Sequence, residues 1–179
     1  MTVRSLLLAP GASGNEASVK PFVDAFATQL DARLVKLPKG QAERAVPAYL
    51  QAVAEASPDV VIGGQSFGGR VASLLAAEEE DVAGLILFCY PLHPPGRAER
   101  WEQRTEHWPR VACPVLLLSG DRDPFARIGL LEEAVKQLPD ATLHVYPGVG
   151  HGLRPVLNDA LDRVSAFVQG LERPVHSRQ

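Results

Sequence analysis

The chain has 179 residues, which suits a single domain, and 46% of them are hydrophobic, which is enough for a sizeable core. Its formal net charge is −3, so the composition excludes the strongly basic proteins that bind nucleic acid or an anionic membrane surface. The apolar runs at Leu6–Ala9 and Leu85–Tyr90 are too short to span a bilayer, and the N-terminus lacks the apolar region and cleavage site of a signal peptide.

The first third of the chain alternates predicted strands with predicted helices. Val3 to Ala9 is apolar on both faces towards its end, which is typical of a buried parallel strand. Apolar residues at helical spacing from Val19 to Leu30 predict a helix that packs against the sheet. Arg33–Leu37 is shorter and more polar, which favours an edge strand. A second helix is predicted over Val46 to Val53, where Pro47 is compatible only with the first turn.

A glycine-rich stretch joins the next strand to the next helix. Val60–Gly63 predicts a buried strand, Val71–Ala76 predicts a helix, and Gly64-x-Ser66-x-Gly68 between them has the spacing of a nucleophile elbow. A strand that reverses directly into a helix forces the central residue to a positive φ, and side chains two positions away would collide with neighbouring elements. An ordinary turn can carry the same pattern, but the flanking strand and helix favour a nucleophile at Ser66.

The rest of the chain continues the alternation. We expect strands at Gly84–Tyr90, Val115–Ser119 and Ala141–Tyr146. We expect helices at Arg97–His107, which is charged, and at Leu130–Leu138 and Leu157–Val168. Such alternation predicts a parallel sheet covered on both faces, a three-layer α/β/α sandwich. We place one domain at residues 1–172 and a polar tail at 173–179. Cys89 and Cys113 lie in or beside strands and form no disulfide framework or metal spacing, so we expect both in the core.

A serine hydroxyl is a poor nucleophile until a base removes its proton. His151 follows the last predicted strand in a glycine-bounded loop, at the sheet edge where ligands of such folds bind. His93 follows the fourth strand on the same side and is a weaker candidate, either as the base or as a pocket residue. His107, His144 and His176 have structural explanations, on a helix, within a strand and in the tail. We therefore expect His151 to be the base.

An imidazole base needs a carboxylate that holds its tautomer. Asp121 and Asp123 both follow the fifth strand. Asp123 lies farther out along the loop and is favoured, whereas Asp121 is better suited to capping the turn. The order Ser66, Asp123, His151 is also the order of hydrolases that carry a nucleophile elbow.

An oxyanion needs two preorganised N–H donors. Phe67, the residue after the predicted nucleophile, supplies one from the helix start, and Ala12 in the loop after the first strand is the candidate for the other. Gly11 and Gly14 let the backbone approach there. The rival interpretation of this loop, a phosphate-binding loop, lacks the Gly-Lys-Ser/Thr ending and the Gly-x-Gly-x-x-Gly spacing.

Together these residues resemble the α/β-hydrolase superfamily over nearly the whole chain. More narrowly, Leu7–Ala12, Gly64–Arg70 and Tyr90–Gly96 resemble a small subgroup of uncharacterised bacterial hydrolases, testis-expressed hydrolase-like proteins and a hydrolase-like domain in a nonspecific-lethal chromatin complex subunit. Dienelactone hydrolases are similar in size but use cysteine at the elbow. Two departures are visible: Pro10 replaces the usual histidine of the oxyanion loop, and the two leading antiparallel strands of larger members are missing. There is also no cap domain, and only the short stretch Pro91–Pro109 is available in its place.

The resemblance implies about six parallel strands in the order 2-1-3-4-5-6 and a serine hydrolase of a small ester or thioester. Ser66 would attack the carbonyl, His151 would move the proton, and Asp123 would orient the imidazole. A binding or scaffold module that kept its elbow without useful turnover is the alternative. A peptidase is disfavoured, because little chain is available to build a peptide cleft.

The remaining expectations concern the surroundings of the site. Tyr90, His93 and Trp101 would line a shallow substrate site. We expect neither a cofactor nor a metal ion, a small-molecule substrate as the partner, and binding to neither nucleic acid nor membrane. We also expect a soluble, cytoplasmic protein. The oligomeric state and the acyl and leaving groups do not follow from the sequence.

Overall fold

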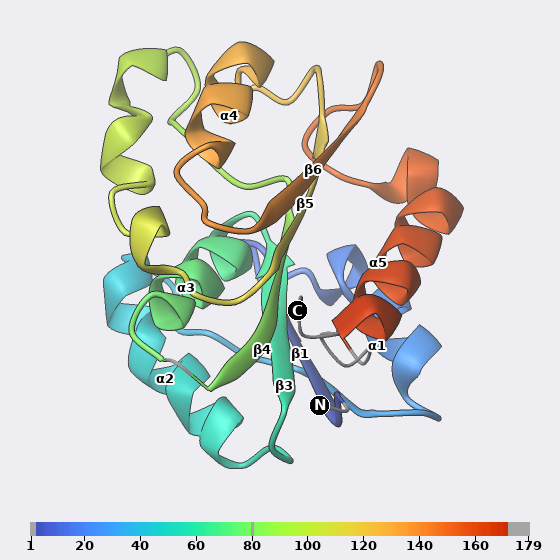
Figure 1. Ribbon diagram of the computed structural model, residues 1–179. Helices are drawn as coiled ribbons and strands as arrows, with labels where there is room; N and C mark the ends of the chain where they lie inside the picture. The colour runs from blue at the N-terminus through green and yellow to red at the C-terminus, as the bar shows by residue number, and fades with distance from the viewer. Residues whose placement is uncertain (1–2, 80, 172–179) are drawn as a thin grey trace, which may run out of the picture.

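The computed structural model describes residues 3–79 and 81–171, so the tail predicted at 173–179 lies outside the described residues. Its centre is a sheet of six parallel strands in the order β2-β1-β3-β4-β5-β6, which confirms the predicted order (Figure 1). The strands are β1 (Ser5–Ala9), β2 (Asp31–Leu34), β3 (Val60–Gln65), β4 (Val82–Phe88), β5 (Val115–Gly120) and β6 (Ala141–Tyr146).

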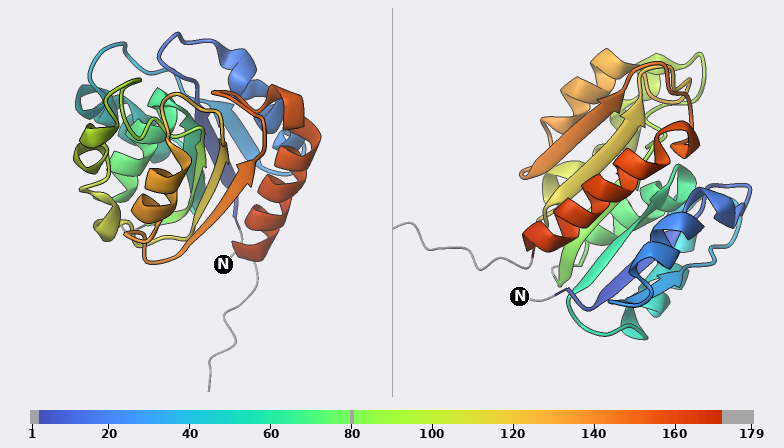
Figure 2. Two further views of the ribbon diagram at one scale, coloured as in Figure 1. Left: turned by 90° about the horizontal axis from the view of Figure 1, so that it is seen from above. Right: turned by 90° about the vertical axis from the view of Figure 1, so that its right-hand side faces the viewer.

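Helices cover both faces of this sheet and complete the predicted three layers. They are α1 (Lys20–Phe26), α2 (Ala42–Ala54), α3 (Phe67–Ala76), α4 (Ile128–Val135) and α5 (Leu157–Leu171). Helices α1 and α5 lie on one face, and α2, α3 and α4 lie on the other (Figures 1 and 2). None of the helices in the described part of the chain is both long and apolar enough to cross a membrane.

The core lies on both sides of the sheet because successive strand residues point to opposite faces. Leu7 and Ile62 belong to the cluster under α2, α3 and α4. Leu6, Leu8 and Val61 belong to the cluster under α1 and α5. This division explains why the strands read as continuous apolar runs rather than as alternating patterns.

Parallel pairing brings the loops that carry the candidate residues to one edge of the sheet. The end of β1 is paired with the end of β3, Ala9 with Gly64, so the loop after β1 begins beside the elbow. The ends of β5 and β6 are paired in the same way, Gly120 with Tyr146. The Asp123 loop and the His151 loop therefore leave the sheet from neighbouring strands.

The predicted charged helix at 97–107 is wrong. The structure has two short 3₁₀ turns there, Ala98–Arg100 and Glu102–Arg104, and a third just after them, Trp108–Arg110. Thr105, Trp108 and Val111 are all buried, and their spacing of three residues suits the 3₁₀ repeat rather than the α-helical one.

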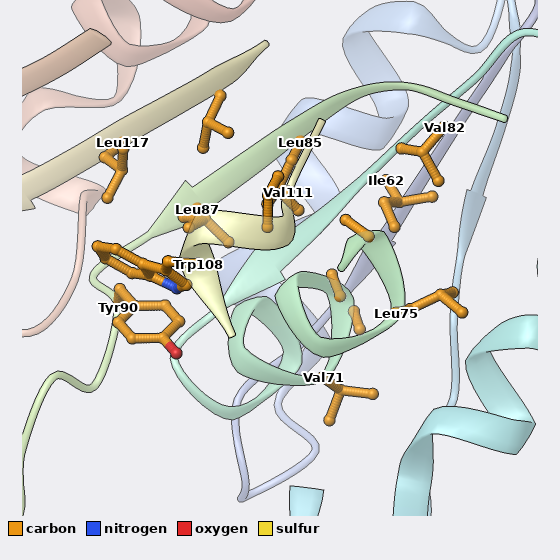
Figure 3. Close-up of a cluster of buried hydrophobic side chains, with 14 of the residues drawn as sticks. Ile62, Val71, Leu75, Val82, Leu85, Leu87, Tyr90, Trp108, Val111 and Leu117 are labelled. Atoms are coloured by element: carbon orange, nitrogen blue, oxygen red, sulfur yellow. The ribbon is translucent and has the colours of Figure 1, made fainter. Parts of the chain in front are cut away.

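The 3₁₀ segment is anchored in the core by an aromatic pair. Figure 3 shows Trp108 beside Tyr90, with ring centroids 4.9 Å apart and planes inclined by 60°. Both rings are almost completely buried. Cys89 and Cys113 are buried as predicted, and burial raises the pKa of the Cys113 thiol to about 11.

Two boundaries also differ from the prediction. The first helix ends at Phe26 rather than near Leu30, and β2 begins already at Asp31, so the chain turns between them. In α2, Pro47 is the sixth residue rather than part of the first turn, because the helix already begins at Ala42, which is buried against the sheet.

Candidate active site

Ser66 lies at the sharp turn between β3 and α3. Its backbone has φ 51° and ψ −115°, the positive φ predicted for the elbow. A Cβ placed on Gly64 would lie 2.3 Å from the carbonyl oxygen of Ala9, and one on Gly68 would lie 2.3 Å from the same oxygen. The requirement for glycine two positions before and after Ser66 is therefore confirmed, since backbone fills both spaces.

The structure brings Ser66, His151 and Asp123 together in one chain of hydrogen bonds. Oγ of Ser66 lies 2.8 Å from Nε2 of His151, and Nδ1 of His151 lies 2.7 Å from Oδ2 of Asp123. An ionised carboxylate can only accept, so Nδ1–H of His151 donates to Asp123. Nε2 is then left with its lone pair and accepts the Ser66 hydroxyl. This tautomer is the one that can receive a proton from the serine.

Asp123 is positioned by its own loop as well as by the imidazole. Its side chain is fully buried, and its Oδ1 accepts the backbone N–H of Phe125 at 2.8 Å. Asp121 instead accepts the N–H of Gly148 at 2.7 Å in an exposed turn. The Asp123 loop is also fastened to the next loop, because the N–H of Arg122 donates to the carbonyl of Val149 at 2.9 Å.

The two N–H groups predicted to hold an oxyanion come from residues beside Ser66. Phe67 is the first residue of α3, so its N–H has no acceptor within the helix. Ala12 lies in a turn in which the N–H of Gly14 donates to the carbonyl of Gly11 at 2.9 Å. Ala12, Ser66 and Phe67 line one cavity.

Two cavities flank the hydroxyl and the imidazole. The cavity that contains Ser66 has a volume of about 370 Å³ and is lined by Ala12, Gly40, Gln41, Ala42, Glu43, Ser66, Phe67, Arg70, Pro91, Arg104 and Phe125. A second cavity, of about 490 Å³, reaches His151 from the side of α1 and α5. Its apolar lining residues are Ala17, Pro21, Phe22, Phe88, Leu153 and Leu157.

Three predicted substrate-binding residues are not among the residues that line the Ser66 cavity in the described ranges. His93 is buried: its Nδ1–H donates to the carbonyl of Pro94 at 2.9 Å, and its Nε2 accepts the N–H of Arg127 at 3.0 Å. Tyr90 is buried, and its hydroxyl donates to the carbonyl of Arg104 at 2.6 Å. Trp101 packs half-buried against the core. Tyr90 and His93 thus hydrogen-bond to backbone groups of neighbouring loops.

Apart from Ala12 and Phe67, the residues that line the Ser66 cavity were missed by the sequence reasoning. Arg70 could have been found, because it lies one helical turn after Ser66 and so shares its side of α3. Phe125 follows Asp123 closely. Glu43 and Arg104 come from distant segments and carried no local signal. Within the described ranges, no group of three or more His, Cys, Asp or Glu is placed to hold a metal ion.

Two of the three charged residues that line the Ser66 cavity in the described ranges are arginines, Arg70 and Arg104. Arg70 donates to Glu43 at 2.6 Å, and Nη1 of Arg104 donates to the carbonyl of Pro91 at 2.8 Å. Burial and the nearby charge of Arg70 hold the pKa of Arg104 below its usual value. Burial, followed by the charges of Arg70 and Arg110, lowers the pKa of His107 to about 4.

Comparison with known proteins agrees with this architecture. Solved structures with the same fold include a membrane phospholipase A described as a bacterial virulence factor, with 17% identity, a TM-score of 0.80 and coverage of 96% of this chain and 80% of that one. Est1E from Butyrivibrio proteoclasticus has 14% identity and a TM-score of 0.80, and covers 95% of this chain and 88% of its own. A thermophilic esterase from Thermogutta terrifontis has 19% identity and a TM-score of 0.73, and the match covers 96% of this chain and 92% of the esterase.

At these identities the likeness concerns the fold alone. The sequence itself matches a family model, described as an alpha/beta hydrolase domain, over residues 35–170. That match spans β3, the elbow at Ser66 and every element from there into α5. The chain therefore belongs to the α/β-hydrolase family.

Proposed function

We propose that this α/β hydrolase is a serine hydrolase that cleaves carboxylic esters or thioesters through an acyl-enzyme. The observation that carries the proposal is the hydrogen-bonded chain from Ser66 through His151 to Asp123, with the serine on a positive-φ elbow. The esterases among the structural neighbours support the same class of reaction.

The first half of the reaction transfers the acyl group to the enzyme. Oγ of Ser66 attacks the substrate carbonyl while Nε2 of His151 takes the hydroxyl proton. The carbonyl oxygen becomes an oxyanion, which the N–H groups of Ala12 and Phe67 stabilise. The tetrahedral intermediate then expels the alcohol or thiol, which receives the proton from His151. Asp123 stabilises the imidazolium formed between these two proton transfers.

The second half releases the acid. A water molecule gives a proton to His151 as its oxygen attacks the acyl carbon, and a second oxyanion forms in the same place. When this intermediate collapses, the bond to Oγ of Ser66 breaks and His151 returns the proton to the serine. The net change is one ester or thioester and one water converted to an acid and an alcohol or thiol.

The test compares the wild-type protein with Ser66→Ala, using p-nitrophenyl esters of short and medium chain length and a fluorophosphonate probe. We expect wild type to turn over the esters and to be labelled by the probe, and Ser66→Ala to do neither. Ser165→Ala on α5 is the matched control, because this serine lies outside the cavity, and it should behave as wild type. Full labelling of Ser66→Ala, or a wild type without turnover and labelling, would overturn the proposal; the second result is the one expected of a binding module.

A further inference from the structure

Two arginines also line the cavity that contains Ser66. Arg70 comes from α3, where its N–H donates to the carbonyl of Ser66 at 3.0 Å, and Arg104 comes from the 3₁₀ segment between β4 and β5. Nη2 of Arg70 donates to Glu43, while Nε of Arg70 is buried and has no hydrogen-bond partner among the described residues. A guanidinium carries five N–H donors, so both residues retain donors for a ligand.

These positive charges are not balanced by the carboxylates around them. Glu43 is the acidic side chain that lines this cavity among the described residues, and it is 58% exposed. A neighbouring hollow of about 280 Å³ shares Ala12 and Phe67 with the cavity and adds two lysines against one glutamate: Lys36, Lys39 and Glu16.

The two hollows together are therefore lined by four basic and two acidic side chains, although the whole chain has a net charge of −3. A concave site with this excess attracts anions. Burial, and after it the nearby charge of Arg70, lowers the pKa of Arg104, so the two like charges lie near enough to repel each other. An anion between the two guanidinium groups would relieve that repulsion and would accept bidentate hydrogen bonds.

We propose that the substrate is an ester or thioester that carries a carboxylate, and that Arg70 and Arg104 bind this carboxylate while the scissile carbonyl lies at Ser66. This inference rests on the proposed function and names its substrate class. The second cavity, on the other side of His151, is lined mainly by apolar side chains together with Arg154, and its apolar part would then take the uncharged end of the substrate. The carboxylate belongs either to the acyl part or to the leaving group, and the chemistry that recognises it is the same.

The first experiment measures selectivity on two matched pairs of esters. The acyl pair is 4-nitrophenyl hemiglutarate and 4-nitrophenyl valerate; the leaving-group pair is 4-butyryloxybenzoate and phenyl butyrate. We expect kcat/KM to favour the anionic member of one pair by about 10- to 100-fold, the range of charge-assisted hydrogen bonds. Which pair shows the preference identifies the part of the substrate that carries the carboxylate. Equal rates within both pairs would overturn the proposal.

Variants of the two arginines test whether they cause the selectivity. Arg70→Gln and Arg104→Gln should each lower the ratio of anionic to neutral kcat/KM by about tenfold or more, mainly through KM, whereas Arg104→Lys should retain part of it. The matched control is Arg100→Gln, which removes the same charge from an exposed position of the same segment outside the cavity, and it should leave both rates unchanged. A ratio that survives in both arginine variants would overturn the assignment.

A binding measurement separates this inference from the proposed reaction. In Ser66→Ala, which cannot form an acyl-enzyme, calorimetry should detect glutarate or benzoate, and adding Arg104→Gln should weaken that binding by about tenfold. If neutral esters are hydrolysed through Ser66 but neither acid binds and no anionic ester is preferred, the inference fails and the proposed function stands. If one acid binds through Arg104 but no ester is hydrolysed, the proposed function fails and the anion site stands.

Discussion

The rings of Phe125 and His151 lie against each other, with centroids 4.4 Å apart and planes inclined by 37°. The backbone N–H of Phe125 also donates to Asp123, whose other carboxylate oxygen accepts from His151. Phe125 thus contacts both His151 and Asp123, and its ring packs against the imidazole.

The first prediction follows from this contact. Phe125→Ala keeps the backbone hydrogen bond to Asp123 but removes the ring, so the imidazole gains freedom to tilt away from Ser66. Because an aromatic contact of this kind contributes about 1 kcal/mol, we expect kcat for an activated ester to fall about 3- to 10-fold. Phe125→Tyr retains a ring and should keep most of the activity. A Phe125→Ala protein with wild-type kcat would show that the contact does not orient His151.

The second prediction distinguishes the two aspartates after β5. Asp123→Asn places an amide opposite Nδ1 of His151 and favours the wrong tautomer, so we expect kcat to fall about 10²- to 10⁴-fold with the fold retained. Asp121→Asn changes an exposed turn residue that contacts Gly148 and should alter kcat by less than about threefold. Steady-state kinetics and circular dichroism of both variants provide the measurement. Similar losses in the two variants would contradict the assigned role of Asp123.

The third prediction concerns the glycines. A Cβ at Gly68 would lie 2.3 Å from the carbonyl oxygen of Ala9 and 2.5 Å from that of Pro10, and both are backbone atoms that a rotamer change cannot move. Gly68→Ala should lower the free energy of unfolding by about 1–3 kcal/mol and also lower kcat, because the Ala12 loop must shift.

Gly129→Ala is the control for this change. Gly129 lies in α4 with open space around its Cβ position, so alanine there should raise the free energy of unfolding by about 0.5–1 kcal/mol. Urea denaturation measures both values. Equal effects of the two substitutions would mean that the close approach at the elbow does not limit stability.

The fourth prediction is a pH dependence of stability. His107 is buried beside Arg70 and Arg110, and its Nε2–H donates to Ser73 Oγ at 2.8 Å while the Ser73 hydroxyl donates to the carbonyl of Arg70. Burial and the two arginines lower the pKa of His107 from 6.5 to about 4, so the folded protein keeps this imidazole neutral.

Between these two values the unfolded chain binds a proton that the folded chain does not. The free energy of unfolding therefore falls as the pH is lowered through this window, by on the order of 3 kcal/mol from this group. His107→Gln has no titrating group at this position, so its stability should fall less between pH 7 and pH 5. Urea denaturation at both pH values compares the two proteins. If the free energy of unfolding of wild type and of His107→Gln changed equally with pH, a neutral, buried His107 would be contradicted.

The strands and the elbow could be predicted because their signals are local, whereas the strand order came from the resemblance to the α/β-hydrolase superfamily. Continuous apolar runs such as Leu6–Ala9 indicate strands buried on both faces, and the alternation with helices implies parallel pairing. The glycines two positions before and after Ser66 indicate a close approach of backbone on both sides of a sharp turn, at which Ser66 itself adopts a positive φ. The spacing of Asp123 and His151 after neighbouring strands was enough to expect them near Ser66.

The surroundings of the site could not be predicted in the same way. Tyr90 and His93 were expected to line the substrate site, but each turns inward, where a backbone carbonyl or N–H supplies its hydrogen bonds. The segment before β5 was expected to be a helix, whereas the burial of Trp108 among core side chains makes it a series of 3₁₀ turns.

Local patterns in the chain were thus sufficient for the sheet, for the strained serine and for the loops that present a base and an acid. The presence of Glu43 and Arg104 beside Ser66 followed only from the packed molecule, since they come from elements far from the elbow in the chain. The physical reason is that backbone conformation depends on neighbours in sequence, whereas the partners of a buried polar group depend on which segments pack beside it.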